Sequence, residues 1–473
     1  MADILKPDLC VIGAGAVGIS LAVKARQRGL SVVLLPRASD DNDHPAARLR
    51  RAAFMASAER AQAIRSAGQV GLDNAEPKPN FRNISDHSLA IAEAIAPRDD
   101  HERLKALGIT ILIGEAAFID RQTLRIGETT IRARQFALAT GSEPVAPLLP
   151  GLDQIAFFTP DTIADNLRKL SHLVVIGGDP AALELAQAYR RMGSMVTVVP
   201  QDGLLTGFDP ELVAILLQHL RNEGVAILEN SVVTAINPRK QGIGVAILRD
   251  GAEDALDASH ILVAMGRQPL LDAGLLDKAK LRFETSRPQF LKLDTDGQTS
   301  SNRITALGGA AGADQPHIAD RQASLLIERL AGLGNGRLEP AQSVRLVQTQ
   351  PALAQTGLLE EETLRSGQTI LRSNLAEHET DRAAGAAGGT VKLLAGHKGT
   401  IIGAGAVGLG ASELIALLSI AATSGTTLGS LNRLALPQPS IAATLVDLAE
   451  QFQSQQPAGK GIARIPVIGR LMA

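Results

Sequence analysis

The stretch Asp8-Leu9-Cys10-Val11-Ile12-Gly13-Ala14-Gly15-Ala16-Val17-Gly18 decides the fold. Its first half is apolar and β-branched, which predicts a short buried strand. The residues after its glycines have helical spacing up to Arg28, and Leu30–Leu35 predicts a second strand. The sequence therefore predicts a β-α-β unit over residues 8–36, with a glycine-rich turn between the first strand and the helix.

The glycines of this turn have the spacing that a dinucleotide needs. Gly13 allows the tight turn, Gly15 lets a pyrophosphate approach the backbone, and Gly18 lets the helix pack on the strand. The helix start favours an anion because its first N–H groups are unpaired and its dipole is positive there. The acid that should bind the ribose after the second strand is missing, because the chain has Pro36 there. The expected pyrophosphate contacts are Gly13, Ala14, Gly15, Ala16, Val17 and Gly18.

A second unit of this kind, at His172–Pro200, has lost more of the pattern. Its turn begins with Gly177, but Asp179 and Ala182 stand where the second and third glycines belong. A carboxylate at this point repels a pyrophosphate, and Pro200 replaces the ribose-binding acid. We therefore expect that no nicotinamide dinucleotide binds here in the usual mode. Gly177 remains the candidate nucleotide contact, and the alternative is a unit kept for its fold alone.

Composition excludes several other functions. A chain of 473 residues with 45% hydrophobic residues should form two to four packed domains. With 2% aromatic residues and a net charge of −2, it lacks the rings and the field that nucleic-acid binding uses. The single cysteine, Cys10, excludes an internal disulfide and a Cys-rich metal site and indicates a reducing compartment. We expect a cytoplasmic protein without a transmembrane segment and without a metal site.

The rest of the chain divides at proline-rich and glycine-rich segments. A helix is predicted over Ala46–Ile64, and Pro144–Pro150 forms a connector between domains. From about Pro340 strands alternate with longer helices. A third glycine string, Gly403–Gly408, is interpreted as a structural turn because no strand ending in an acid follows it. A small antiparallel layer is predicted from short apolar runs at 109–114, 116–120, 123–126 and 129–132.

Seven blocks of the sequence together carry a resemblance to a known family. They are Val11–Gly18, Ala139–Pro144, Leu173–Val199, Ala264–Pro269, Ile304–Gly309, Gln350–Glu362 and Thr380–Ala383. In this order they resemble the class I pyridine nucleotide-disulfide oxidoreductases, especially the mercuric reductase and dihydrolipoamide dehydrogenase branch. The resemblance covers nearly the whole chain.

The resemblance implies an α/β fold with two Rossmann-like dinucleotide-binding domains, one inserted in the other, and a C-terminal α+β dimerisation domain. In that family the first domain binds FAD, the inserted one binds NAD(P)H, and the C-terminal domain forms a homodimer. Thr140 and Gly141 are then further FAD contacts. Glu184 matches a glutamate near the flavin–nicotinamide junction, with a solvated or core-edge helix position as its alternative. The implied domains are 1–150 with 265–335 (FAD-binding type), 151–264 (NAD(P)-binding type) and 340–455 (dimerisation), followed by a tail at 456–473.

The chain departs from this family at its chemical centres. The redox-active cysteine pair would fall around His44–Phe54, where there is no cysteine. The His-Glu pair that relays protons to those thiols is replaced by Gln438 and Ala443, and an amide cannot take up a proton as an imidazole does. Gly309 replaces the aspartate that holds the ribityl chain of FAD. Dithiol chemistry is excluded, and no residue is assigned a catalytic role.

Two functions remain open. The first is an FAD-dependent oxidoreductase that passes electrons from flavin to a non-disulfide acceptor such as a quinone or a protein. The second is a catalytically silent homologue, a structural or regulatory subunit that forms a homodimer or a heterodimer with an active paralogue. The intact first glycine pattern favours the first, because loss of all ligands should have changed both turns alike.

Overall fold

The chain forms two compact units, Met1–Glu339 with Arg345–Gln350 and Pro340–Val344 with Pro351–Ala473. The computed structural model describes residues 4–37, 45–94, 101–313, 315–334, 337–339, 343–363, 368–385 and 388–456, with only the backbone at 45–47. The helices in these ranges are all too short or too polar to span a lipid bilayer.

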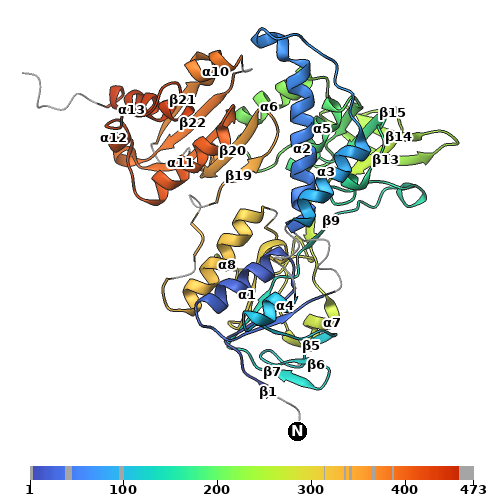
Figure 1. Cartoon of the computed structure of the whole chain (residues 1–473), viewed down its shortest axis with the longest axis vertical. Helices are drawn as coiled ribbons and strands as arrows, with labels where there is room; N and C mark the ends of the chain where they lie inside the picture. The colour runs from blue at the N-terminus through green and yellow to red at the C-terminus, as the bar shows by residue number, and fades with distance from the viewer. Residues whose placement is uncertain are drawn as a thin grey trace, which may run out of the picture. The chain divides into compact units, whose positions relative to one another are not determined.

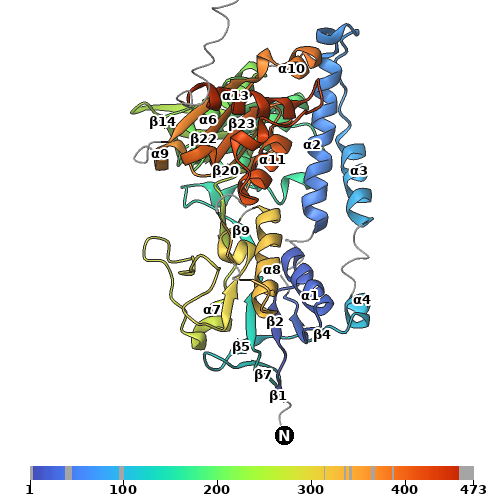
Figure 2. The same cartoon turned by 90° about the vertical axis from the view of Figure 1, so that its left-hand side faces the viewer.

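A five-stranded parallel sheet, of which β2 and β4 are labelled in Figure 2, lies at the centre of the first β-α-β unit. Every residue of its two middle strands β2 and β3 is buried, which explains why their sequences are continuously apolar. The strands, in spatial order, are β18 (Ile304–Ala306), β8 (Gln135–Leu138), β2 (Leu9–Ile12), β3 (Val32–Leu35) and β4 (Thr110–Ile111).

Two helices, α1 (Ala16–Gln27) and α8 (Pro316–Leu330), lie side by side on this sheet (Figures 1 and 2). Leu21 of α1 and Leu326 of α8 belong to the same buried cluster as Leu9 of β2. The predicted first β-α-β unit is therefore confirmed.

A small sheet is formed by β1 (Ile4–Leu5), β7 (Thr129–Ile131), β6 (Leu124–Ile126) and β5 (Ala116–Phe118). The antiparallel pairs β5–β6 and β6–β7 confirm three of the short runs predicted for this layer. The prediction for 109–114 was wrong, because β4 pairs in parallel with β3 at the edge of the main sheet. Ile109, just before β4, belongs to the same buried cluster as Leu21 of α1. Sequence alternation alone does not indicate which sheet a two-residue strand joins.

The second β-α-β unit has a parallel sheet in the order β12, β11, β10, β16, followed by antiparallel hairpins. Its helices α5 (Pro180–Arg191) and α6 (Pro210–Asn222) both begin with an aspartate cap and a proline. The strands are β10 (His172–Ile176), β11 (Met195–Val199), β12 (Ala226–Ile227), β13 (Ser231–Pro238), β14 (Ile243–Arg249), β15 (Ala252–Ala258) and β16 (His260–Val263).

A helical pair, α2 (Pro45–Arg65) and α3 (Phe81–Glu93), packs on the second β-α-β unit (Figures 1 and 2). The ring centroid of Tyr189 on α5 lies 5.1 Å from that of Phe54 and 6.3 Å from that of Phe81. The predicted helix at 46–64 is confirmed. The remaining elements of the first compact unit are α4 (His101–Ala106), β9 (Ser142–Pro144), β17 (Arg267–Pro269), α7 (Ala273–Leu276) and β19 (Arg345–Val347).

The second compact unit, which is the C-terminal one and is called the second unit below, contains antiparallel strands in the order β20, β23, β22, β21. They are β20 (Ala352–Gly357), β21 (Thr369–Asn374), β22 (Thr390–Ala395) and β23 (Ile401–Gly408). Its helices are α9 (Glu360–Thr363), α10 (Glu379–Ala384), α11 (Ala411–Thr423), α12 (Leu428–Leu431) and α13 (Thr444–Ser454).

The interpretation of Gly403–Gly408 as a turn was wrong. These residues lie within β23, which pairs with β20 on one side and β22 on the other. A Cβ on Gly403 would lie 2.2 Å from the carbonyl oxygen of Leu358, so a close chain crossing requires this glycine. The predicted tail from 457 onward lies outside the described residues.

Candidate functional site

The first glycine turn is closed by backbone contacts that only glycine allows. Gly13 follows β2 with φ +108°, and a Cβ there would lie 2.2 Å from the carbonyl oxygen of Ala139. A Cβ on Gly18 would lie 1.9 Å from the carbonyl oxygen of Gly13. The turn therefore brings the end of β2, the first turn of α1 and the end of β8 into direct contact.

The N-terminus of α1 carries no negative charge of its own. Gly15 is its cap residue, and no acidic residue lies in its first turn, which begins Ala16-Val17 after Ala14 and Gly15. The first N–H groups of a helix have no partner within it, and the dipole there is positive. These residues can therefore accept an anion such as a pyrophosphate.

A buried hydroxyl lies beside this turn. Thr140 is 3% exposed, and its Oγ1 has no hydrogen-bond partner among the described residues. Its backbone nitrogen lies 3.1 Å from the position that a Cβ on Gly13 would take. Gly141 follows with φ +74°. An unpaired buried hydroxyl is costly, so a polar ligand group at this point would be stabilising.

The position that lacks the family's aspartate is tightly enclosed. A Cβ on Gly309 would lie 2.7 Å from the backbone of Gly141 and Ser142 and from the Ser142 hydroxyl. Arg267 holds Ser142 in place, since its Nε donates to Ser142 Oγ at 2.8 Å and its Nη2 to Ser142 O at 2.6 Å. Asp161 completes the cluster with an ion pair to Arg267 at 2.7 Å. A restored aspartate would need a backbone shift here.

This cluster was missed by the sequence analysis. Arg267 was named only as part of a family block, and Asp161 was not singled out, because their partnership joins residues about a hundred positions apart. The structure brings the first turn, Thr140, Gly141 and Gly309 together; Val17 reaches Gly308, where a Cβ would lie 3.0 Å from its Cγ2.

The second glycine turn repeats the first at its start and differs at the helix. Gly177 has φ +128°, and its Cβ would lie 1.8 Å from the carbonyl oxygen of Ala264. At the N-terminus of α5, Asp179 Oδ1 accepts the backbone N–H of Ala182 at 2.7 Å. Its Oδ2 accepts the N–H of Gly266 at 3.1 Å. A carboxylate of the chain itself therefore caps the start of α5.

The ribose positions are also filled without an acid. After β11, Pro200 is followed by Gln201, whose side chain donates to the carbonyl of Val233 at 3.1 Å and accepts its N–H at 2.8 Å. After β3, Pro36 is followed by Arg37, which donates to the carbonyl of Leu270 at 3.3 Å.

Glu184 lies on α5 of the second β-α-β unit. It is 6% exposed, so the alternative of a solvated position was wrong. Its Oε1 accepts the backbone N–H of Gln348 at 2.7 Å. Burial raises the pKa of this carboxyl, and the positive charge of Arg51 on α2 offsets the shift only in part.

No thiol is available near these residues in the described part of the chain. Cys10 is buried within β2, and burial raises the pKa of its thiol. The region expected for the cysteine pair begins at His44, which lies outside the described residues, and continues into α2. There Arg50 forms an ion pair with Asp165 at 2.7 Å. Gln438 is exposed in the second unit.

Comparison with known proteins places the chain in one family. The pyridine nucleotide-disulphide oxidoreductase model matches residues 7–331, and that family's dimerisation-domain model matches residues 343–449. Mercuric reductase of Streptomyces lividans is 26% identical, with 94% of this chain and 96% of the relative covered. Dihydrolipoyl dehydrogenase of Geobacillus stearothermophilus is 25% identical, with 94% and 96% covered.

Solved structures agree on the fold. LpdA from Mycobacterium tuberculosis matches with a TM-score of 0.82 at 20% identity, covering 95% of this chain and 99% of that one. The HOCl-induced flavoprotein disulfide reductase RclA from Escherichia coli matches with a TM-score of 0.78 at 20% identity, covering 94% and 99%. The expected α/β fold, with two Rossmann-like domains and a C-terminal dimerisation domain, is confirmed. The chain belongs to the pyridine nucleotide-disulphide oxidoreductase family, whose members are flavin-dependent oxidoreductases.

Proposed function

We propose that this chain binds FAD in its first β-α-β unit and passes electrons from the flavin to an acceptor that is not a disulfide, such as a quinone or a protein. The observation that carries the proposal is the difference between two helix starts in one chain. α1 begins at Gly15 without an acidic residue, beside the unpaired hydroxyl of Thr140. α5 begins at Asp179, whose carboxylate binds two backbone N–H groups.

The residues present fit the pyrophosphate end of FAD. Gly13–Gly18 would hold the pyrophosphate at the start of α1, and Thr140 and Gly141 would lie beside it. When bound, FAD supplies reversible electron transfer that no side chain offers. The protein's own part is to bind and orient this group, and no side chain is proposed as an acid or a base.

The proposed acceptor class follows from the missing thiols. Disulfide reduction through the protein needs a pair of cysteines, and this chain has only Cys10, which is buried in a strand. The proposed donor is not NAD(P)H bound in the family's usual mode, since Asp179 stands at the anion position of α5. For a nicotinamide dinucleotide bound in an altered mode, we propose Gly177 and Glu184 as contact residues.

A catalytically silent homologue is the second candidate, and the enclosure of Gly309 favours it. The backbone of Gly141 and Ser142 fills the space where a side chain toward the ribityl group would begin. The dimerisation domain would then carry the function, by binding a second copy of this chain or an active paralogue. The four-part domain division and the cytoplasmic location stay predictions.

A titration with FAD tests the proposal. Protein stripped of flavin should bind added FAD, with quenched flavin fluorescence and a higher melting temperature. Thr140→Val removes the unpaired hydroxyl and should weaken FAD binding about tenfold, the equivalent of one hydrogen bond. Thr444→Val is the matched control, because Thr444 Oγ1 is also buried and without a partner among the described residues, but lies in the second unit. Absence of FAD binding would favour the silent homologue.

A further inference from the structure

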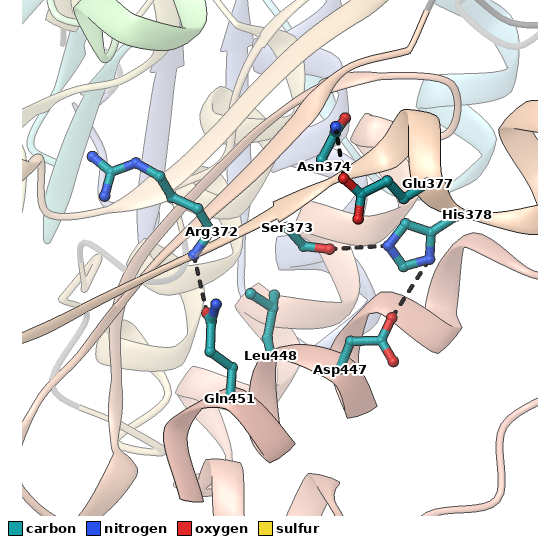
Figure 3. Close-up of a pocket in the computed structure, with 8 residues that line it drawn as sticks. All are labelled: Arg372, Ser373, Asn374, Glu377, His378, Asp447, Leu448 and Gln451. Atoms are coloured by element: carbon teal, nitrogen blue, oxygen red, sulfur yellow. Dashed lines mark hydrogen bonds and ion pairs between the residues drawn. The ribbon is translucent and has the colours of Figure 1, made fainter. Parts of the chain in front are cut away.

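Three polar side chains of the second unit form a connected group (Figure 3). Ser373 lies near the end of β21, His378 is the cap residue of α10, and Asp447 lies in the first turn of α13. The Ser373 hydroxyl lies 2.9 Å from Nε2 of His378. Nδ1 of His378 lies 3.5 Å from Oδ2 of Asp447.

The two ring nitrogens of His378 therefore have separate partners. In the tautomer that carries its proton on Nδ1, next to the Asp447 carboxylate, Nε2 can accept the hydroxyl proton of Ser373. This connectivity lets an imidazole remove a proton from a serine while a carboxylate holds its tautomer and orientation. A second carboxylate, Asp381, interacts electrostatically with His378 and is 1% exposed, with both oxygens lacking a hydrogen-bond partner among the described residues.

The chain between Ser373 and His378 is held rigidly. Leu375 N–H donates to the carbonyl of Gly389 at 2.9 Å, and His378 N–H donates to the carbonyl of Leu375 at 3.0 Å. Asn374 caps this short turn by accepting the N–H of Ala376 at 3.1 Å. These bonds fix the spacing of the serine and the histidine before any ligand arrives, as a preorganised site requires.

The group lines a cavity of about 400 Å³, within the range of small-molecule sites. α13 is tied to the sheet edge here, because Arg372 N–H donates to Gln451 Oε1 at 3.2 Å. Backbone N–H groups two residues apart on a strand point to the same side, so the N–H of Asn374 also faces away from β22. That N–H, next to the serine, is placed to donate to an oxygen that becomes negative. The Arg372 guanidinium points away from Ser373 (Figure 3).

We propose that Ser373, His378 and Asp447 form a second active centre, which hydrolyses short acyl esters. Ser373 Oγ forms a bond to the ester carbonyl carbon while its proton moves to His378 Nε2, and that proton passes to the departing alkoxide as the ester C–O bond breaks. Water then attacks the acyl-serine, gives a proton to Nε2, and releases the carboxylic acid as the proton returns to Ser373. The reaction needs only ester and water, so it is independent of the flavin proposal.

Labelling by a fluorophosphonate, with peptide mass spectrometry on the full-length protein, tests the proposal. The expected result is a single labelled residue, Ser373, with labelling lost in His378→Gln and kept in Ser424→Ala. Ser424 is a matched control, because its hydroxyl lies in the same unit and bonds the carbonyl of Ile420. An unlabelled Ser373 in the wild-type protein would overturn the proposal, and this arm does not depend on whether any variant folds.

Hydrolysis of p-nitrophenyl acetate gives the second readout. Wild-type protein should show saturable turnover, and Ser373→Ala should lower kcat/KM by about 100-fold or more. Asp447→Asn should lower it less, because Asp447 only positions the ring. Equal rates for wild type and Ser373→Ala would mean unspecific acyl transfer to the surface and would contradict the centre.

Discussion

The first glycine of each turn is required by the fold itself. Cβ atoms on Gly13 and Gly177 would collide in the same way, with the carbonyl oxygens of Ala139 and Ala264. Both residues are therefore needed whether or not a nucleotide binds, and neither distinguishes the two β-α-β units. The residue that does so is two positions further on, where the first β-α-β unit has Gly15 and the second has Asp179.

Gly13→Ala should destabilise the protein more than Gly29→Ala. Both glycines have positive φ, +108° and +78°, but no atom lies within 4 Å of a Cβ built on Gly29. Gly29→Ala should cost only the left-handed strain, about 1–2 kcal/mol. Gly13→Ala adds a backbone collision and should cost about 3 kcal/mol or more. Urea denaturation of the two variants checks this, and equal losses would show that the turn is less tightly closed than described.

Glu184 should make stability depend on pH. Burial raises its folded-state pKa above the unfolded value of about 4.3, so the folded state keeps a proton that the unfolded state has released. The stability from this group is full below the unfolded pKa and is lost as pH rises through the folded pKa. Glu184→Gln keeps an oxygen for the Gln348 N–H and should become more stable than wild type as pH rises.

The exposed Glu76 provides the control for this pH series. Its hydrogen bond with Arg65 lowers its pKa, so its contribution is lost as pH falls, and Glu76→Gln should show the opposite trend. Melting temperatures from pH 4 to 8 measure both. A flat difference between Glu184→Gln and wild type would mean that Glu184 has an ordinary pKa in the folded protein.

At the scale of elements, α1 and α5 are equivalent helices of the two β-α-β units, and they differ in their N-cap residues, Gly15 and Asp179. Asp179 caps α5 and also bonds Gly266, the residue after the strand-end segment Ala264-Met265. The carboxylate thereby accepts two backbone N–H groups at the start of α5. We propose that this cap competes with an anionic ligand for the same end of the helix.

Asp179→Gly should restore some affinity for a nicotinamide dinucleotide. Glycine is a tolerated cap, so the helix should lose only a few tenths of a kcal/mol. Removing the negative charge from the helix start should tighten NADH or NADPH binding by about tenfold. Isothermal titration calorimetry measures this. Asp209→Gly is the matched control, because Asp209 caps α6 in the same way by accepting the N–H of Glu211. Unchanged affinity in Asp179→Gly would place the obstacle elsewhere.

Most regular elements could be predicted from the sequence, because continuous apolar runs and glycine turns are local signals. The strands β2, β3 and β10 and the helix α2 follow from such signals. What could not be predicted are pairings between distant residues. β4 joins the main sheet, Arg267 bonds both Ser142 and Asp161, and His378 lies next to Asp447. The sequence indicates the negative charge of Asp179 at the start of α5, but it does not indicate that the Gly266 N–H would be a second hydrogen-bond partner of this carboxylate.

At the scale of the whole molecule, the two proposed activities lie in different units. The flavin proposal rests on residues before Arg345, and the hydrolytic proposal rests on β21, α10 and α13 of the second unit. The second unit also exposes apolar side chains on α11, where Ile420 is 65% exposed. The match to the family's dimerisation-domain model covers residues 343–449, which include α11.

The visible absorbance spectrum of the freshly purified protein, before and after anaerobic NADH or NADPH, tests the central claim most directly. We predict a yellow protein with flavin absorption bands that neither nucleotide bleaches, as follows from the proposed FAD site at α1 and the proposed block by Asp179 at the start of α5. A colourless protein that takes up no added FAD would contradict the flavin site. Rapid bleaching by either nucleotide would contradict the proposed block by Asp179 in the second β-α-β unit.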